Sequence, residues 1–143
     1  MNETANVEIL PMTSTHVDDV IALWNVTEGL ILTSTDNLDD LQFYFDRNPG
    51  ISQVAIHGKT VVGAALCGHD GRRGYLHHLA VSVAYRRQGI GRQLVAACLR
   101  ELRRVGISQC NLFVVTDDDD AQRFWSNGQW QSWENIQLFS KTL

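Results

Sequence analysis

A basic loop that contains two glycines offers the clearest chemistry in this sequence. The loop runs from Arg86 to Arg92 and includes Gly89 and Gly91. Because glycine has no Cβ, backbone N–H groups in such a loop can approach an anion closely, and a helix that starts here adds unpaired amides and the positive end of its dipole. The arginines add mobile positive charge. The loop therefore predicts a binding site for phosphate groups.

The segments on either side of this loop are the elements that must position it. Before it, Tyr75–Val83 predicts a strand, and its second half, Leu79–Val83, is an apolar run. After it, apolar residues recur at helical spacing from Leu94 to Val105, and Gly106 follows as a C-terminal stop. The sequence thus predicts a strand, a phosphate-binding turn and an amphipathic helix in direct succession.

The rest of the chain continues this alternation of strands and helices without a linker or a repeat. In chain order it predicts a strand at 7–10, helices at 17–24 and 38–45, a hairpin at 54–66, a strand at 110–115, a helix through 124–125 and a last strand at 133–139. Either Asp36 or Asn37 caps the second helix. Because no boundary interrupts this order, we expect a single domain over residues 1–143.

Length and composition predict a soluble globular protein. The chain has 143 residues, of which 44% are hydrophobic and 20% are charged. No apolar run is long enough for a membrane span, and the first residues lack the basic and apolar regions of a signal peptide. The net charge of −4 argues against nucleic acid as the main partner. We therefore expect a cytoplasmic protein with no nucleic-acid or membrane partner.

The three cysteines predict neither a disulfide nor a metal site. Cys67, Cys98 and Cys110 are odd in number, widely spaced and placed in apolar segments. Such a pattern is typical of reduced thiols in a core.

Charges of opposite sign are segregated along the chain. Residues 1–50 hold nine acidic side chains against Arg47 alone, whereas residues 72–104 hold eight arginines against Glu101 alone. Two interpretations are open. Either the basic half binds an anionic cofactor and the acidic half faces a cationic substrate, or both are solvated helix faces.

The order of elements, together with Leu79-Ala80-Val81 shortly before Arg86-x-x-Gly89-x-Gly91, resembles the GNAT superfamily of acetyl-CoA-dependent N-acetyltransferases. The resemblance covers almost the whole chain and includes an Ala-x-x-Phe-aromatic segment at 121–125. It implies an α/β (α+β) fold with a mixed, mostly antiparallel sheet of about six or seven strands and about four helices, in the order β-α-α-β-β-β-α-β-α-β. It also implies direct transfer of acetyl from acetyl-CoA to a primary amine of a small molecule or a peptide.

The resemblance further implies which residues bind coenzyme A. Backbone groups of Leu79, Ala80 and Val81 pair with the pantetheine arm, and an amide near Leu79 or Val81 stabilises the oxyanion. The loop binds the pyrophosphate. The loop residues concerned are Arg86, Arg87, Gln88, Gly89, Ile90, Gly91 and Arg92.

Acetyl transfer to an amine needs a group that removes a proton from the ammonium form. His77 is the first candidate, because strand alternation places it on the same face as Leu79 and Val81, and an arylalkylamine acetyltransferase of the family is similar here. The alternative is a histidine that only hydrogen-bonds within the sheet. His78 is expected on the opposite face, in a structural role.

Two further residues are candidates for the reaction itself. Tyr75 stands where other members of the family have a catalytic glutamate, and its hydroxyl can donate a hydrogen bond but is a poor base at neutral pH. Glu28, in the polar segment after the first helix, is the alternative proton acceptor or ammonium anchor.

The chain departs from the family pattern in its last quarter. Trp125 stands where the family commonly has a tyrosine that protonates the departing thiolate, and an indole N–H cannot do this. A thiol with a pKa of about 8.5 can leave unaided. Asp118 replaces an asparagine that contacts the cofactor, and Gln129-Trp130 replaces Gly-Phe.

Two alternatives to an enzyme follow from these departures. The first is a catalytically weak acyl-CoA-binding sensor or regulatory module that keeps the cofactor site. The second is a purely structural or interaction domain, which only the tryptophans favour. Against it, Trp125, Trp130 and Trp133 are expected to pack within the C-terminal half or in a contact between the two copies of a homodimer.

Overall fold

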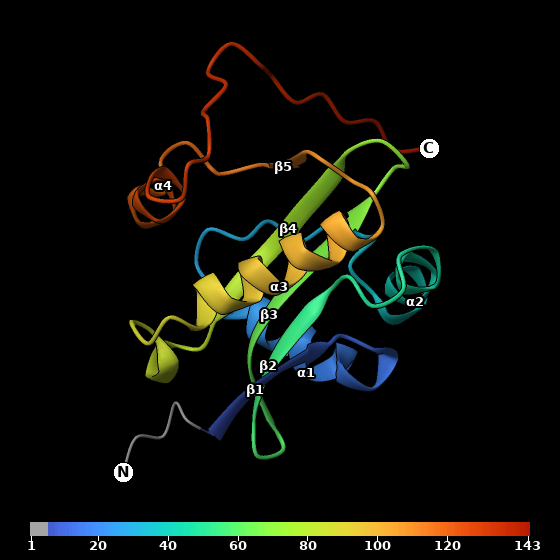
Figure 1. The fold of residues 1–143 in the computed structure, drawn as a ribbon, viewed down its shortest axis with the longest axis vertical. Coiled ribbons are helices and arrows are strands. Elements are labelled where there is room, and N and C mark those ends of the chain that lie inside the picture. The colour runs from blue at the N-terminus through green and yellow to red at the C-terminus, as the bar shows by residue number, and fades with distance from the viewer. Residues whose placement is uncertain (1–5) are drawn as a thin grey trace. The chain divides into compact units, whose positions relative to one another are not determined.

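A five-stranded sheet organises the computed structural model, which describes residues 6–143 (Figure 1). Its strands are β1 (Val7–Pro11), β2 (Gln53–His57), β3 (Thr60–His69), β4 (Gly74–Val81) and β5 (Cys110–Leu112), in that spatial order. Each of the first three strands pairs antiparallel with the next, whereas β4 and β5 run parallel. The predicted mixed, mostly antiparallel sheet is confirmed.

Four α-helices connect the strands within residues 6–143. They are α1 (Val17–Asn25), α2 (Leu38–Arg47), α3 (Ile90–Arg104) and α4 (Asp119–Ser126). A short 3₁₀ turn, η2 (Ser14–His16), precedes α1, and another, η3 (Val83–Tyr85), follows β4. Asn37 caps α2, since its side chain accepts a hydrogen bond from the Asp40 amide at 2.9 Å. In this part of the chain no helix combines the length and the apolar character needed to cross a membrane.

The number of strands is lower than predicted. Residues 6–143 form five strands instead of six or seven, and the expected last strand at 133–139 is absent from them. This segment is exposed throughout, and its one backbone hydrogen bond is a local turn from the Ile136 amide to the Trp133 carbonyl. Alternating apolar residues form a strand only where a sheet edge pairs with their backbone groups, and no such edge pairs with this segment.

The chain divides into two compact units, Met1–Phe113 and Val114–Leu143. The first unit contains the whole sheet with α1, α2 and α3, and the second contains α4 and the residues after it. The single domain over residues 1–143 stays a prediction.

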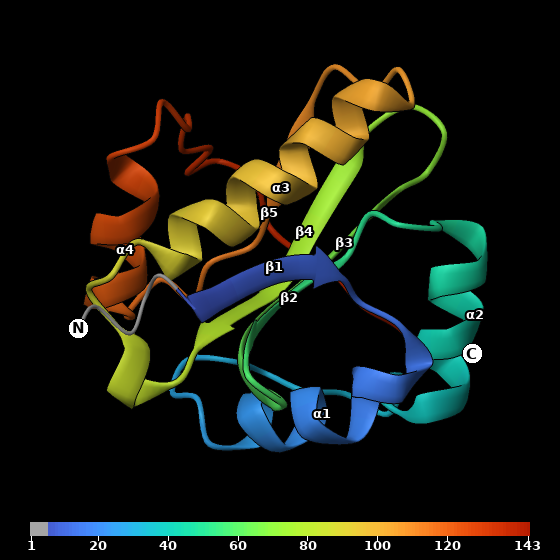
Figure 2. The same cartoon turned by 60° about the horizontal axis from the view of Figure 1, so that its bottom comes forward.

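Helices cover both faces of the sheet in the first unit (Figure 2). On the α3 face, a Cβ built on Gly63 would lie 3.0 Å from Leu94, and one built on Gly74 would lie 2.5 Å from Leu102. On the opposite face, called the α1 face below, helices α1 and α2 enclose the main core, with Trp24 only 1% exposed. The sheet residues of this core are Val54, Ala64, Leu66 and Ala80. These two layers fix the directions of the side chains on β4.

The three cysteines are free thiols, with Cys67 and Cys98 buried and Cys110 half-buried. In residues 6–143, no group of three or more His, Cys, Asp or Glu side chains is placed to hold a metal ion.

Candidate functional site

A bulge in β4 at His78 shapes the candidate site. Ala64 of β3 pairs with Ala80, but the next pair joins Leu66 to His77, so β4 holds one extra residue in this interval. His78 takes up the extra length with a φ of +53°, in the left-handed region that side chains rarely adopt. Such strained residues cluster at functional sites.

The bulge overturns the predicted alternation along β4. Directly paired residues share a face, so His77 lies on the α1 face with its partner Leu66. Val81 pairs with Gly63, whose open side faces α3, and Leu79 alternates with Val81. The expectation that His77 shares a face with Leu79 and Val81 is therefore wrong, because the extra residue reverses the period of two between them.

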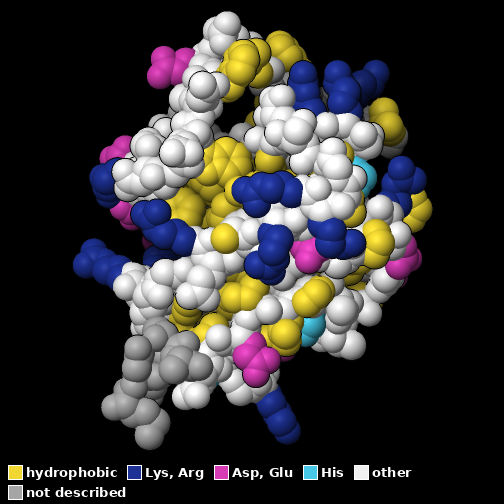
Figure 3. Space-filling model, viewed as in Figure 1, with side chains coloured by type: hydrophobic (Ala, Val, Ile, Leu, Met, Phe, Trp, Pro, Cys, Tyr) yellow, Lys and Arg dark blue, Asp and Glu magenta, His cyan; other side chains and the backbone are white. Residues whose placement is uncertain are grey.

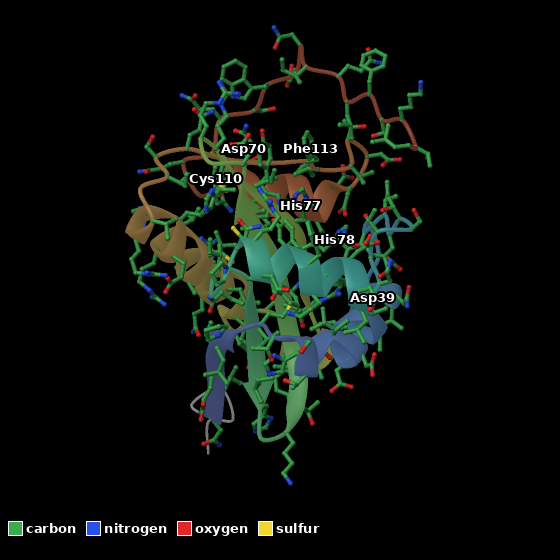
Figure 4. All side chains as sticks on the ribbon, turned by 90° about the vertical axis from the view of Figure 1, so that its right-hand side faces the viewer. Asp39, Asp70, His77, His78, Cys110 and Phe113 are labelled. Atoms are coloured by element: carbon green, nitrogen blue, oxygen red, sulfur yellow. The ribbon has the colours of Figure 1, made fainter. Side chains whose placement is uncertain are left out.

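A row of aromatic rings crosses the α1 face from β4 to α1. Tyr75 and His77 stack with ring centroids 6.4 Å apart, His77 and His78 lie 6.2 Å apart, and His78 meets Trp24 edge-on at 4.9 Å. Figure 4 shows both histidines side by side on β4. His78 was expected on the opposite face, and the bulge is the reason that it joins this row instead.

The pKa of His77 is lowered from its usual value. Burial is the main cause, since it disfavours the charged imidazolium, and repulsion from His78 acts in the same direction. The carboxylate of Asp36 opposes both effects. The result is an imidazole that is neutral near pH 7 and able to accept a proton.

Asp36 is a site residue that the sequence did not single out. Its Oδ1 lies 3.0 Å from Nε2 of His78, although the two residues are 42 positions apart. Its Oδ2 accepts the backbone N–H of Thr33 at 2.8 Å. The only sequence signal was an acidic residue beside a helix cap, and nothing in its spacing pointed to His78.

The edge of β4 that faces β5 is open over most of its length. Strand β5 pairs only with Gly74–Leu76, so within residues 6–143 no strand pairs with residues 77–81 on that side. Leu79, Ala80 and Val81 are in this open stretch. An extended ligand would pair with β4 on this open side, where the Val81 carbonyl already accepts a hydrogen bond from Nε of Arg86.

The basic loop leads directly from this strand into α3. Arg86 donates a hydrogen bond from Nε to the Val81 carbonyl at 3.0 Å, so its side chain holds the strand end. Arg87 and Gly89 have φ values of +62° and +81°, and a Cβ on Gly89 would meet nothing within 4 Å. Lys and Arg side chains gather over α3 on the face shown in Figure 3. The loop is an exposed, positively charged turn with room beside its backbone.

Helix α3 presents the amides of its first turn to this loop. The Gln93 amide donates to the Gly89 carbonyl at 3.0 Å, so the amides before it precede the hydrogen-bonded ladder of the helix. Ile90 is buried and anchors the turn, whereas Gln88 is exposed and Gly91 is half-buried. Together with the helix dipole, these groups suit an anion such as pyrophosphate. The predicted strand, turn and helix succession is confirmed.

Three other predicted site residues lie outside β4 and the basic loop. One follows α1 and two are in the second unit. Glu28 is exposed after α1 and makes no hydrogen bond to Tyr75 or the histidines among the described residues. In the second unit, Asp118 caps α4 by accepting the Ala121 amide at 3.1 Å. Trp125 packs edge-on against Phe124 and Trp130, with centroid distances of 4.8 and 5.1 Å.

Comparison with known proteins identifies related chains. The model of the acetyltransferase (GNAT) family matches residues 18–128. An acetyltransferase of Sodalis glossinidius is 28% identical over 126 residues, which cover 88% of each chain.

Solved structures with the same fold include two of interest. An aminoglycoside acetyltransferase from an uncultured soil metagenomic sample, in complex with sisomicin, superposes with a TM-score of 0.78 and 19% identity over 99% of both chains. The aminoglycoside acetyltransferase AAC(6')-Iy, in complex with the bisubstrate analogue CoA-S-monomethyl-acetylneamine, gives a TM-score of 0.76 and 16% identity over 96% of this chain and 99% of that one. The predicted α/β fold is confirmed by these likenesses.

Proposed function

Since the chain belongs to the GNAT family of acetyltransferases, we propose that it transfers the acetyl group of acetyl-CoA directly to a primary amine. The observation that carries this proposal is the open edge of β4 followed at once by the left-handed loop and the start of α3. An extended pantetheine arm and a pyrophosphate need these two features in this order. No covalent enzyme intermediate is required.

The residues of β4 and the loop fit coenzyme A in shape and charge. The backbone groups of Leu79, Ala80 and Val81 would hold the pantetheine arm, and an amide at Leu79 or Val81 would stabilise the developing charge on the thioester oxygen. Amides of 87–92, next to the free space at Gly89, would hold the pyrophosphate. When bound, acetyl-CoA supplies an acetyl group activated as a thioester.

His77 is proposed as the group that removes the proton from the acceptor ammonium. It lies on the α1 face of β4, and burial keeps it neutral by lowering its pKa. Tyr75, stacked on it, would donate a hydrogen bond to the acceptor or to the thiolate. Glu28, exposed after α1, is proposed as a more distant anchor for positive charge.

The acceptor is proposed to be a cationic small-molecule amine or a peptide amine. Three carboxylates support a cationic acceptor. Asp36 lies just before α2 and contacts His78, and Asp39 and Asp40 lie in the first turn of α2. An aminoglycoside acetyltransferase with this fold binds sisomicin, which supports a polycationic small molecule as the first class of acceptor to test.

Thiol release tests this proposal. Purified protein is given acetyl-CoA with phenethylamine, spermidine, sisomicin, lysine or a short peptide, and free thiol is measured over time. We expect release only when an amine is present. Binding of coenzyme A without release for any amine would instead support the alternative of an acyl-CoA-binding sensor, while absence of binding would overturn both.

A further inference from the structure

The Asp36–His78 pair joins the loop before α2 to the bulge of β4, next to His77. We propose that this pair is a dyad that receives the proton from His77, with Asp36 acting as a positioning residue. The proposal rests on the proposed function, in which His77 takes a proton from the acceptor ammonium.

The contact with Asp36 fixes the chemistry of the His78 ring. A carboxylate can only accept hydrogen bonds, so Nε2 of His78 is the donor across the 3.0 Å contact. The neutral ring then carries its hydrogen on Nε2 and offers Nδ1 as a proton acceptor. When Nδ1 is protonated, the same carboxylate stabilises the positive charge.

Asp36 is held in place for this role. Its side chain is 7% exposed and that of His78 is 17% exposed, so water screens their contact only weakly. The second carboxylate oxygen accepts the Thr33 amide, and the Asp36 amide donates to the Thr33 carbonyl at 3.1 Å. The carboxylate is therefore oriented by the loop and has one oxygen left for His78.

The two histidines are spaced for proton transfer. Their ring centroids are 6.2 Å apart on the α1 face, and in the proposed relay one water carries the proton between them. Among the described residues, a carboxylate hydrogen-bonds to His78 but none hydrogen-bonds to His77. Among the described residues, the other aromatic rings against the two imidazoles are Tyr75 from β4 and Trp24 from α1. Asp36 is the only anionic side chain that hydrogen-bonds to either ring among the described residues.

The dyad lets His77 act twice in each cycle. Two protons leave the acceptor nitrogen when a primary ammonium becomes an amide. His77 takes the first and passes it to Nδ1 of His78, from which it reaches solvent. His77 then takes the second proton as the C–N bond forms and the C–S bond breaks, and this proton ends on the departing thiolate. Each acetyl group transferred thus yields one amide, one thiol and one released proton.

Kinetics against pH test the relay with the variants Asp36→Asn and His78→Gln. The acceptor is whichever of phenethylamine, spermidine and sisomicin turns over fastest. We expect kcat to fall about tenfold at pH 7, because His77 keeps its proton, and to recover towards pH 9 or with added imidazole. The KM for acetyl-CoA stays unchanged. Asp36→Glu retains the carboxylate and regains part of the lost rate.

Asp19→Asn is the matched control, since Asp19 is an exposed acidic side chain on the first turn of α1 and hydrogen-bonds to neither histidine among the described residues. It should behave as wild type. A loss in Asp36→Asn that is equal at all pH values and is not relieved by imidazole would overturn the relay and leave a purely structural contact.

A second measurement needs no substrate. Nitrogen chemical shifts of the His78 ring should report the Nε2–H tautomer in the wild type and a mixture of tautomers in Asp36→Asn. A mixture already present in the wild type overturns the dyad alone. Absence of turnover in the wild type with every amine overturns the proposed function and the relay together, so the two failures are distinct.

Discussion

Gly89 begins α3 in the left-handed conformation, which makes Gly89→Ala a direct test of the loop as a coenzyme A site. Its φ is +81°, and an added Cβ would meet nothing within 4 Å. The substitution therefore introduces no clash. It adds only the penalty of an L residue in the left-handed region, about 1–2 kcal/mol.

This penalty sets the expected size of the effect. In the free variant the loop is expected to relax towards negative φ, so binding must restore the left-handed shape. A free-energy penalty of about 1–2 kcal/mol corresponds to a decrease of roughly 5- to 30-fold in the affinity for coenzyme A. Titration calorimetry of the variant with coenzyme A measures this decrease, and thiol release should show a matching rise in the KM for acetyl-CoA.

Gly58→Ala is the matched control for the backbone effect. Gly58 lies in the turn between β2 and β3, has a φ of +65°, and also has nothing within 4 Å of its Cβ position. It should lose a similar amount of stability in a denaturant titration but keep its affinity for coenzyme A. Unchanged affinity in Gly89→Ala, or an equal loss in Gly58→Ala, would refute the reasoning.

Three other substitutions test the base and the core that supports the site. His77→Gln should lower kcat/KM about a hundredfold at pH 7 and less at high pH, where the amine is already neutral; because burial lowers the pKa of His77, the acid limb of the wild-type profile should lie below about pH 6.5. A loss independent of pH would contradict this role. Ser52→Ala removes a buried hydroxyl that donates to the Cys67 carbonyl at 3.0 Å and accepts its amide at 2.9 Å, so urea unfolding should show a loss of about 1–3 kcal/mol. Gly74→Ala places a methyl group 2.5 Å from Leu102 and should destabilise by about 1–3 kcal/mol through overpacking, whereas an unchanged midpoint would show that α3 shifts freely.

Elements whose signals are local in the chain could be predicted from the sequence. Apolar residues at helical spacing placed the helix that the structure shows at Ile90–Arg104, and turn residues placed the antiparallel succession of β2, β3 and β4. The segment 133–139 has an equally regular pattern but forms no strand in the structure. The two cases differ in the pairing partner. A strand also needs the edge of a neighbouring strand to pair with, and the position of that edge depends on the rest of the fold.

The candidate site also has a part that could be predicted from the sequence and a part that could not. The glycines of the loop and the strand before it are neighbours in sequence, so their relation could be predicted. The contact between Asp36 and His78 depends on how the loop before α2 lies on the sheet, and on a backbone conformation at His78 that the period of two does not encode. Spacing therefore placed His77 on the wrong face of β4, together with Leu79 and Val81.

The bulge gives β4 two faces with different tasks. With regular pairing, His77 and His78 would point to opposite faces, and only one of them could meet Asp36. The extra residue brings both imidazoles to the α1 face, beside the acidic segment, and turns Leu79 and Val81 towards α3 and the loop that opens it. Proton transfer and cofactor binding are thereby proposed to occupy separate stretches of one strand, on either side of His78. The position of the bulge, more than the identity of any single side chain, decides which residues of β4 can serve each task.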